Sequence, residues 1–334
     1  SKFMDCVLVD KDVIWIGTET GGLNRLTPKS LYVRNYIHNE QNPHSLSPNP
    51  VNSIYEDKDG TLWVGTTEGG LNRKEKNSDD FKLYTEETSG LSHNSVSAII
   101  RDSQNQLWVG TWGNGITIFS TNRTELTVKK YLNGWLPPNL PVNFVGSLCY
   151  DSINDVVWIG SNWGIYYYDF KTDYIYSPFV NEAIANDIHS PLGAVIDSYG
   201  QLWMGCSNGM FVFDLYSRKE NKFSYTHLKY KLDDPTSRLG EKISCFHLSS
   251  DSVLWIGSNG NGFFKHIPGE DGSIGKFVGY NIQDGLVSNV VRGILEDDKK
   301  RLWISTNNGL SCFDPSTDNF TNYTKEDGLV DNQF

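Results

Sequence analysis

One five-residue phrase occurs seven times in this chain. It consists of an aliphatic residue, a tryptophan, another apolar residue, and in most copies a glycine followed by a small residue that usually carries a hydroxyl group. Successive tryptophans are separated by 45 to 52 residues, and a nearly fixed period of this size indicates a repeat architecture. The seven copies are centred on Trp15, Trp63, Trp108, Trp158, Trp203, Trp255 and Trp303.

Each repeat is predicted to form four short antiparallel strands. In the second repeat, Val51, Ile54 and Asp57 follow an apolar-x-x-apolar-x-x-Asp pattern, and an Asp- and Gly-containing turn separates them from the tryptophan phrase. A glycine turn, a third strand and an outer strand follow, here at 71–73 and 81–84. The pattern shows no helical periodicity, so we expect an all-β fold. Residues 1–334 are predicted to form a single seven-bladed β-propeller of four-stranded antiparallel blades.

The phrase also predicts how the blades pack. Side chains alternate along a strand, so Trp63 and Gly65 share one face. We expect each tryptophan to pack between adjacent blades where the glycine makes room, and the recurring aspartates to bond the backbone at their turns. Ser305 replaces the glycine in the last repeat, and Ser249 replaces the aspartate in the sixth. No repeat is divided between the two ends of the chain, so closure by a shared blade is not indicated.

Composition and motifs limit the chemistry. The formal net charge of -11 argues against nucleic acid or an anionic membrane as a partner. The five cysteines show no CxxC pair and are expected to be buried free thiols, although one disulfide stays possible. The seven histidines lack HExxH spacing, and no GxSxG elbow is present. We therefore expect no catalytic residue, metal or cofactor. Carboxylates that meet over a central funnel would still allow a propeller lyase or glycoside-active enzyme.

Residues that break the repeat are the candidate binding residues. Three tryptophans lie outside the phrase, in turns between second and third strands or in a loop between blades, and both kinds of loop emerge on one face of a propeller. Aromatic rings beside asparagines there could stack on sugars and bond their hydroxyl groups, whereas packing or a protein interface is the alternative. Arg292 would suit an acidic sugar if it pointed into the central channel. The predicted ligand-binding residues are Trp112, Asn114, Trp135, Asn143, Asn162, Trp163, His93 and Arg292.

Residues 57–71 read Asp-x-x-Gly-x-Leu-Trp-Val-Gly-Thr-x-x-Gly-Gly-Leu, which resembles the two-component regulator propeller repeat at every position. Residues 90–96 and 284–290 resemble the loops between blades in that family. The resemblance implies a periplasmic sensor region of a hybrid two-component histidine kinase and response regulator. Such a propeller would sense a carbohydrate, or serve as a scaffold, and would control transcription of polysaccharide-utilisation genes.

The resemblance also implies the surroundings of this propeller. In the family, a second propeller and a small immunoglobulin-like domain accompany it, and we expect these partners, an oligosaccharide ligand and a homodimeric parent. Ser1 is not a natural start, and residues 327–334 resemble the stretch entering a further unit. We therefore expect a fragment of a two-propeller region, mostly from the second propeller. The fragment lacks the kinase core and is not expected to be an enzyme; a non-sensing interaction scaffold is the alternative.

Overall fold

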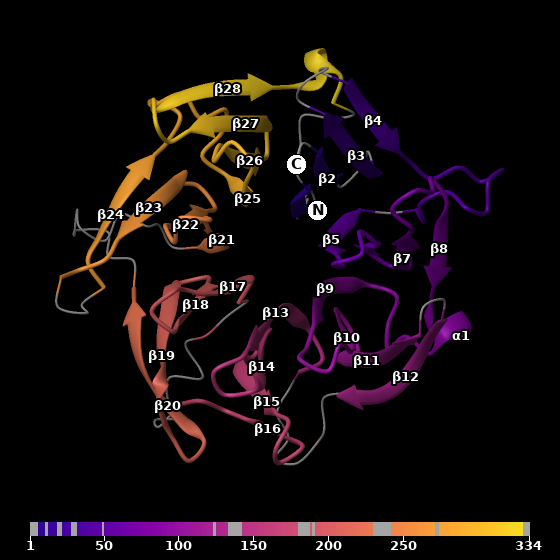
Figure 1. Cartoon of the computed structure of the whole chain (residues 1–334), viewed down its shortest axis with the longest axis horizontal. Helices are drawn as coiled ribbons and strands as arrows, with labels where there is room; N and C mark the ends of the chain where they lie inside the picture. Colours follow the sequence, from indigo (N-terminus) through magenta and orange to yellow (C-terminus); the bar gives the residue numbers. More distant parts are fainter. Residues whose placement is uncertain are drawn as a thin grey trace.

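The predicted propeller is confirmed. The computed structural model describes residues 6–10, 13–18, 22–27, 32–48, 50–122, 125–132, 142–179, 188, 191–229, 242–270 and 274–329. They form seven four-stranded antiparallel sheets, arranged as blades around a central axis (Figure 1). Each blade contains four consecutive strands, with the first strand next to the axis and the fourth at the rim.

The blades are numbered along the chain. Blade 1 contains β1 (Cys6–Asp10), β2 (Val13–Thr18), β3 (Gly22–Thr27) and β4 (Tyr32–Tyr36), and blade 2 contains β5 (Val51–Glu56), β6 (Leu62–Thr66), β7 (Gly70–Lys74) and β8 (Phe81–Tyr84). Blade 3 contains β9 (Val96–Arg101), β10 (Leu107–Thr111), β11 (Ile116–Asn122) and β12 (Glu125–Leu132). Blade 4 contains β13 (Val145–Asp151), β14 (Val156–Ser161), β15 (Gly164–Asp169) and β16 (Tyr174–Tyr176).

The second half of the ring follows the same plan. Blade 5 contains β17 (Gly193–Ile196), β18 (Gln201–Cys206), β19 (Gly209–Lys219) and β20 (Lys222–Leu228). Blade 6 contains β21 (Ile243–Leu248), β22 (Leu254–Ser258), β23 (Phe263–Ile267) and β24 (Lys276–Tyr280). Blade 7 contains β25 (Val291–Glu296), β26 (Leu302–Thr306), β27 (Gly309–Asp314) and β28 (Asn319–Tyr323). The described helices are α1 (Glu86–Ser89) and the 3-10 helix η2 (Lys325–Asp327); no helix in the described residues is long and apolar enough to cross a membrane.

The recurring tryptophans pack between blades, as predicted. Trp63 is 2% exposed and packs against Leu107, Val109 and Phe119 of blade 3. A Cβ atom added to Gly65 would lie 2.4 Å from a methyl group of Val96, so the glycine makes room for the next blade. The same alternation of large and absent side chains recurs around the ring and explains why the phrase is conserved within the chain.

The ring closes without a shared blade. The innermost strands contact each other in sequence around the axis, and β25 of blade 7 contacts β1 of blade 1. Trp303 packs against Ile14, Ile16 and Leu26 of blade 1, and the buried Leu329, which follows blade 7, joins the same cluster. Packing between complete blades therefore closes the ring, which agrees with the absence of a divided repeat in the sequence.

The recurring aspartates bond both the turn and the tryptophan. In blade 3, Asp102 Oδ1 accepts hydrogen bonds from the backbone N–H groups of Gln104 (2.9 Å) and Gln106 (2.8 Å), which confirms the expected backbone role. Its second oxygen accepts the indole N–H of Trp108 at 2.8 Å. The indole bond recurs in the pairs Asp57–Trp63, Asp151–Trp158, Asp197–Trp203 and Asp297–Trp303.

The described cysteine thiols carry no disulfide. Cys149, Cys206, Cys245 and Cys312 are free, and the side chain of Cys6 lies outside the described residues. Burial raises the pKa of Cys149 and Cys245 to about 12 and that of Cys206 and Cys312 to about 11. These thiols are therefore protonated at neutral pH and unsuited to nucleophilic chemistry.

Candidate functional site

The side of the ring that carries the turns between second and third strands is called the upper face here. The repeated phrase stabilises these turns, because the hydroxyl residue that ends the second strand donates a hydrogen bond to the carbonyl oxygen of the glycine at the end of the turn. In blade 3, Thr111 Oγ1 donates to the carbonyl oxygen of Gly115 at 2.8 Å, and Thr66 and Ser258 donate to Gly70 and Gly262 in blades 2 and 6. A short, fixed turn presents whatever residue follows the hydroxyl to the solvent.

Three segments meet on the upper face between blades 3 and 4. The backbone N–H groups of Gly113 and Gly115, in the turn of blade 3, donate to the carbonyl oxygen of Asn143 at 3.0 and 3.1 Å. Trp112 forms an antiparallel bridge with Phe144, and the N–H of Asn162, in the turn of blade 4, donates to the carbonyl oxygen of Phe144 at 3.1 Å. The segment that enters β13 therefore joins the turns of the two blades.

Exposed aromatic rings gather at this junction. The exposed fractions are 38% for Trp112, 40% for Phe144 and 59% for Trp163. The backbone carbonyl of Trp163 accepts a hydrogen bond from the hydroxyl group of the buried Tyr166 at 3.2 Å, so the turn that carries this ring is anchored to its blade. We name Trp112, Phe144 and Trp163 the upper aromatic cluster.

Polar groups border the upper aromatic cluster. Asn114 and Asn162 are exposed in the same turns, and Asn143 is half-buried between them. The Asn114 amide donates to the carbonyl oxygen of Ser92 at 3.1 Å, which fixes its side chain. His93 lies beneath the turn, because a Cβ atom on Gly113 would lie 2.6 Å from its ring. The junction thus places exposed aromatic residues beside asparagines, and the Asn114 amide is held by a hydrogen bond.

Two predicted site residues are not part of this cluster. Trp135 lies outside the described residues. Arg292 lies on β25 in blade 7, and blades 5 and 6 separate it from blade 4. Its side chain is 9% exposed, and its Nε donates to the Asn307 side chain at 2.8 Å. The structure therefore brings together six of the eight predicted residues and leaves Arg292 across the ring.

The sequence did not single out Phe144. An apolar residue directly before an inner strand is typical of the core, and the corresponding residues of other blades are Pro50, Ser95, Lys242 and Val290. The available signal is that blade 4 alone among these five has an aromatic residue at this position, next to two turns that also carry tryptophan.

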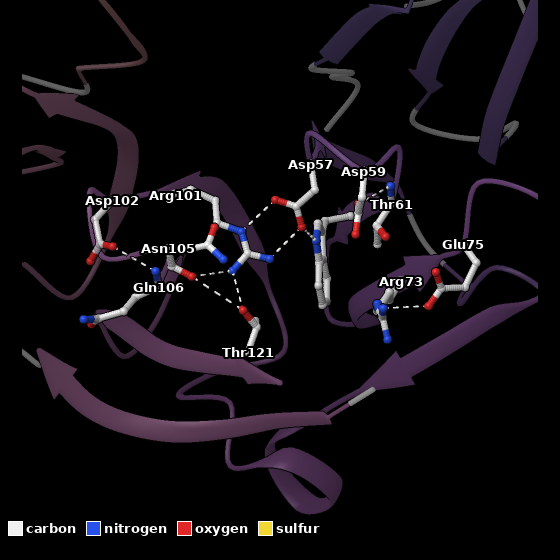
Figure 2. A network of polar contacts seen from close by, with 11 residues as sticks. Asp57, Asp59, Thr61, Arg73, Glu75, Arg101, Asp102, Asn105, Gln106 and Thr121 are labelled. Atoms are coloured by element: carbon white, nitrogen blue, oxygen red, sulfur yellow. Dashed lines mark hydrogen bonds and ion pairs between the residues drawn. The ribbon is translucent and has the colours of Figure 1, made fainter. Parts of the chain in front are cut away.

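A hollow lies between blades 2 and 3 on the opposite side of the ring, which is called the lower face here. It has a volume of about 790 Å³, and its polar contacts are drawn in Figure 2. Arg101 donates from Nε and Nη2 to the two oxygens of Asp57, both at 2.6 Å, and from Nη1 to the carbonyl oxygen of Asn105 and the hydroxyl of Thr121, both at 2.8 Å. Asp57 also accepts the Trp63 indole. These groups satisfy one another and clamp blade 2 to blade 3.

The lower hollow does not have the electrostatics of an acid–base pair. The backbone N–H of Thr61 lowers the pKa of Asp59, whereas a general acid at neutral pH needs a carboxyl group whose pKa is raised. Both oxygens of Asp57 accept hydrogen bonds from Arg101, and one also accepts the Trp63 indole N–H. We interpret the Asp57–Arg101 pair as a structural link between blades.

The chain carries repeats of the family described as two component regulator propeller, at residues 45–68, 90–113 and 285–308. These segments run from the loop before blades 2, 3 and 7 through the tryptophan phrase. The predicted presence of this repeat in the chain is thereby confirmed.

Relatives place the repeat in signalling proteins. The chain is 29% identical over 140 residues to histidine kinase P4 of Formosa agariphila. The aligned region covers 42% of this chain and 10% of that protein. It is 25% identical to the extracellular domain assigned to the hybrid two component system BT3049 of B. thetaiotaomicron, with a TM-score of 0.61, over 99% of this chain and 42% of that one.

A third similarity concerns the fold alone. PorZ, a surface component of the type-IX secretion system of Porphyromonas gingivalis, matches with a TM-score of 0.70 and 16% identity, over 94% of this chain and 46% of that one. The chain thus spans 10% of the curated relative it matches and less than half of these two solved chains. The homologues at higher identity are extracellular or histidine kinase proteins of two-component systems.

Proposed function

We propose that this chain is the ligand-sensing propeller in the periplasmic sensor region of a hybrid two-component system. The two component regulator propeller repeats and the similarity to the extracellular domain of a B. thetaiotaomicron hybrid system support this proposal. In the complete protein, the propeller would act with a second propeller and an immunoglobulin-like domain to control a transmembrane histidine kinase. The output would be transcription of polysaccharide-utilisation genes, and the active unit would be a homodimer.

The proposed ligand is an oligosaccharide bound at the upper aromatic cluster. The observation that carries this proposal is that three exposed aromatic residues and three asparagines lie in segments of two neighbouring blades that backbone hydrogen bonds join. The apolar faces of sugar rings pack on aromatic side chains, and amides bond sugar hydroxyl groups. A ligand that bridges the turns of blades 3 and 4 would signal only if it bound two arrangements of the sensor region with different affinities.

Calorimetry of the complete sensor region against a panel of neutral oligosaccharides tests this proposal. We expect one oligosaccharide to bind and the double variant Trp112→Ala, Trp163→Ala to lose about tenfold or more in affinity, because central aromatic residues dominate such interfaces. The matched control is Tyr199→Ala, Tyr216→Ala, which removes two rings that are 63% and 70% exposed elsewhere on the ring. Absence of binding to every oligosaccharide, or equal losses in the two variants, would refute the sugar site.

The same cluster supports a second function, that of a protein-interaction scaffold. Tryptophans exposed at a rim are typical of protein interfaces as well as of sugar sites. If Trp112→Ala, Trp163→Ala left sugar affinity unchanged but altered self-association of the sensor region in analytical ultracentrifugation, the scaffold would be favoured.

We also propose that the propeller itself is not catalytic. The paired carboxylates and protonated thiols described above support this view. Incubation with polysaccharides should release no new reducing ends and no unsaturated products, and appearance of either would establish an enzyme.

A further inference from the structure

One position of the repeat has a different kind of residue in blade 2 than in the other six blades. The third strand of each blade has a residue that packs on the tryptophan of the preceding blade, as Tyr168 packs on Trp108 with ring centroids 5.3 Å apart. In six blades this position is apolar or aromatic or a histidine: Leu26, Phe119, Tyr168, Phe213, His266 and Phe313. Blade 2 has Lys74 instead, at the end of β7.

Lys74 is buried like its counterparts. Its side chain is 5% exposed, and its ammonium group lies 5.4 Å from the ring centroid of Trp15 and 5.7 Å from that of Tyr36. Within the described part of the chain, its ammonium group donates a hydrogen bond to the carbonyl oxygen of Glu75 at 3.4 Å. No ion pair among the described residues includes Lys74. Buried ammonium groups are normally paired with a carboxylate, so this one is costly to the folded state.

A second cation, Arg25, lies over the same ring and forms no ion pair with the residues that the structure describes. Arg25, on β3 of blade 1, lies over the Trp15 ring at 5.8 Å. The neighbouring carboxylate of Asp79 is already engaged, because it accepts from Arg34 at 2.7 Å and from the Tyr36 hydroxyl at 2.8 Å. Two cations therefore share one indole ring, and neither forms an ion pair among the described residues, although Asp79 and Glu56 attract Lys74 at longer range.

These cations line a hollow that is open to a small ligand. A pocket of about 380 Å³ lies between blades 1 and 2 on the lower face, and Arg25, Lys74, Lys76, Asn77 and Ser78 contribute to its wall. Four cationic and two acidic residues line it, namely Arg25, Arg34, Lys74 and Lys76 against Glu56 and Asp79. Burial, reinforced by Arg25 and Arg34, lowers the pKa of Lys74, while Asp79 and Glu56 oppose the shift. A positive hollow stands out in a chain with a formal net charge of -11.

We propose that this hollow is an oxyanion site, in which Lys74 and Arg25 bind the carboxylate or sulfate group of a small acidic solute. A core position occupied by a charge that forms no ion pair among the described residues, against the pattern of six other blades, is the kind of local conflict that function explains. An oxyanion would add a counter-charge in direct contact with both groups. The site is separate from the upper aromatic cluster, so it does not depend on the saccharide proposal.

Calorimetry with this chain tests the site, using inorganic sulfate, glucuronate and neutral glucose as probes at constant ionic strength. We expect saturable binding of sulfate or glucuronate and none of glucose. Lys74→Met and Arg25→Gln should each weaken binding by about tenfold or more, because hydrogen bonds to charged groups are lost. Binding of only one of the two anions supports the site and identifies the group it prefers.

Thermal unfolding distinguishes a variant that has lost anion binding from a variant that has lost its folded structure. Lys74→Met should raise the melting temperature without ligand, since it restores the apolar pattern of the other blades, and this gain should accompany the loss of anion binding. Lys265→Gln is the matched control, because Lys265 lies over Trp255 as Arg25 lies over Trp15 but is remote from the hollow. The proposal is overturned if neither anion binds, if glucose binds as well as glucuronate, or if Lys74→Met keeps wild-type affinity or melts earlier.

Discussion

At the scale of single residues, the recurring aspartate and the recurring tryptophan form one unit. Asp102 closes its turn with one oxygen and holds the Trp108 indole with the other, while 93% of its surface is buried. Blade 6 shows a reduced form, because Ser249 exchanges hydrogen bonds with the backbone of Val253 at 3.0 Å but offers no carboxylate to an indole. The turn needs an acceptor at this position, and the tryptophan benefits from a second one.

Asp102→Ala should destabilise the protein by about 2–4 kcal/mol, because it leaves the buried backbone N–H of Gln106, the half-buried N–H of Gln104 and the buried indole N–H of Trp108 without their acceptor. Asp102→Ser should cost less, since serine can still bond the turn as it does in blade 6. Chemical denaturation of both variants measures the difference, with Ser103→Ala at the exposed neighbouring position as a control. Equal stability of Asp102→Ala and the wild type would mean that water replaces the carboxylate.

At the scale of the strands, a pair of small residues decides how closely blades approach. In blade 2, Ser53 on β5 lies opposite Gly65 on β6. Blade 7 has the reverse arrangement, with Gly293 on β25 opposite Ser305 on β26. A Cβ atom on Gly293 would lie 2.9 Å from a Val7 methyl group and 3.1 Å from the Ser305 hydroxyl oxygen. The missing glycine of the seventh phrase is therefore compensated on the neighbouring strand.

This compensation predicts non-additive mutations. Gly293→Ser alone should cost about 1–3 kcal/mol by overpacking the contact with blade 1. Adding Ser305→Gly should recover part of that loss, because it restores the arrangement of blade 2. A double-mutant cycle by denaturation measures the coupling, and strictly additive losses would show that the two positions do not share their space.

The repeat predicted the blades, their number and the contacts of the tryptophans, because these depend on a period that the chain repeats. It did not predict the sites. Phe144 was missed because an apolar residue before an inner strand is typical of the core, yet here three segments meet and leave it exposed. Lys74 was missed because a lysine at a strand end is usually solvated, and its burial follows from how blade 2 packs on Trp15. Both depend on contacts between blades, which the order of residues within one repeat does not specify.

At the scale of the whole molecule, the contact between blades 7 and 1 closes the ring, and Leu329 reinforces it. Leu329 is 3% exposed and packs with Ile14, Ile16 and Trp303. It takes the place that Leu91 and Leu286 take between other blades, where each is buried in the contact between its neighbours. None of the described sheets contains strands of both blade 7 and blade 1, and the contact seen between them is made by side chains.

Leu329→Ala should cost about 2–4 kcal/mol, as for other buried leucines. We also expect faster hydrogen exchange in β1 and β2 than in β9 and β10, because the loss opens the closing contact first. Leu286→Ala, between blades 6 and 7, is the control: a similar loss of stability should leave exchange in β1 unchanged. Equal exchange of β1 in the two variants would indicate that the ring unfolds as one unit.

The whole ring should also be sensitive to alkaline pH. Burial raises the pKa of Cys149 and Cys245 from 9.0 to about 12 and that of Tyr166 from 10.0 to about 12. The folded state then keeps protons that the unfolded chain releases, so this stabilisation is complete below pH 9 and is lost as pH rises toward 12. On the acid side, burial lowers the pKa of His247 and His266 from 6.5, so their contribution is lost as pH falls below that value.

Stability should therefore be highest between about pH 6.5 and 9, where neither set of buried groups opposes folding. Urea denaturation at intervals from pH 5 to 10.5 measures this profile. A Cys149→Ala, Cys245→Ala variant should be less stable at neutral pH, because it loses buried volume, but its stability should fall less steeply above pH 9. If the alkaline limb of this variant kept the wild-type slope, the buried thiols would not be its cause, and repulsion among the excess acidic groups would explain it instead.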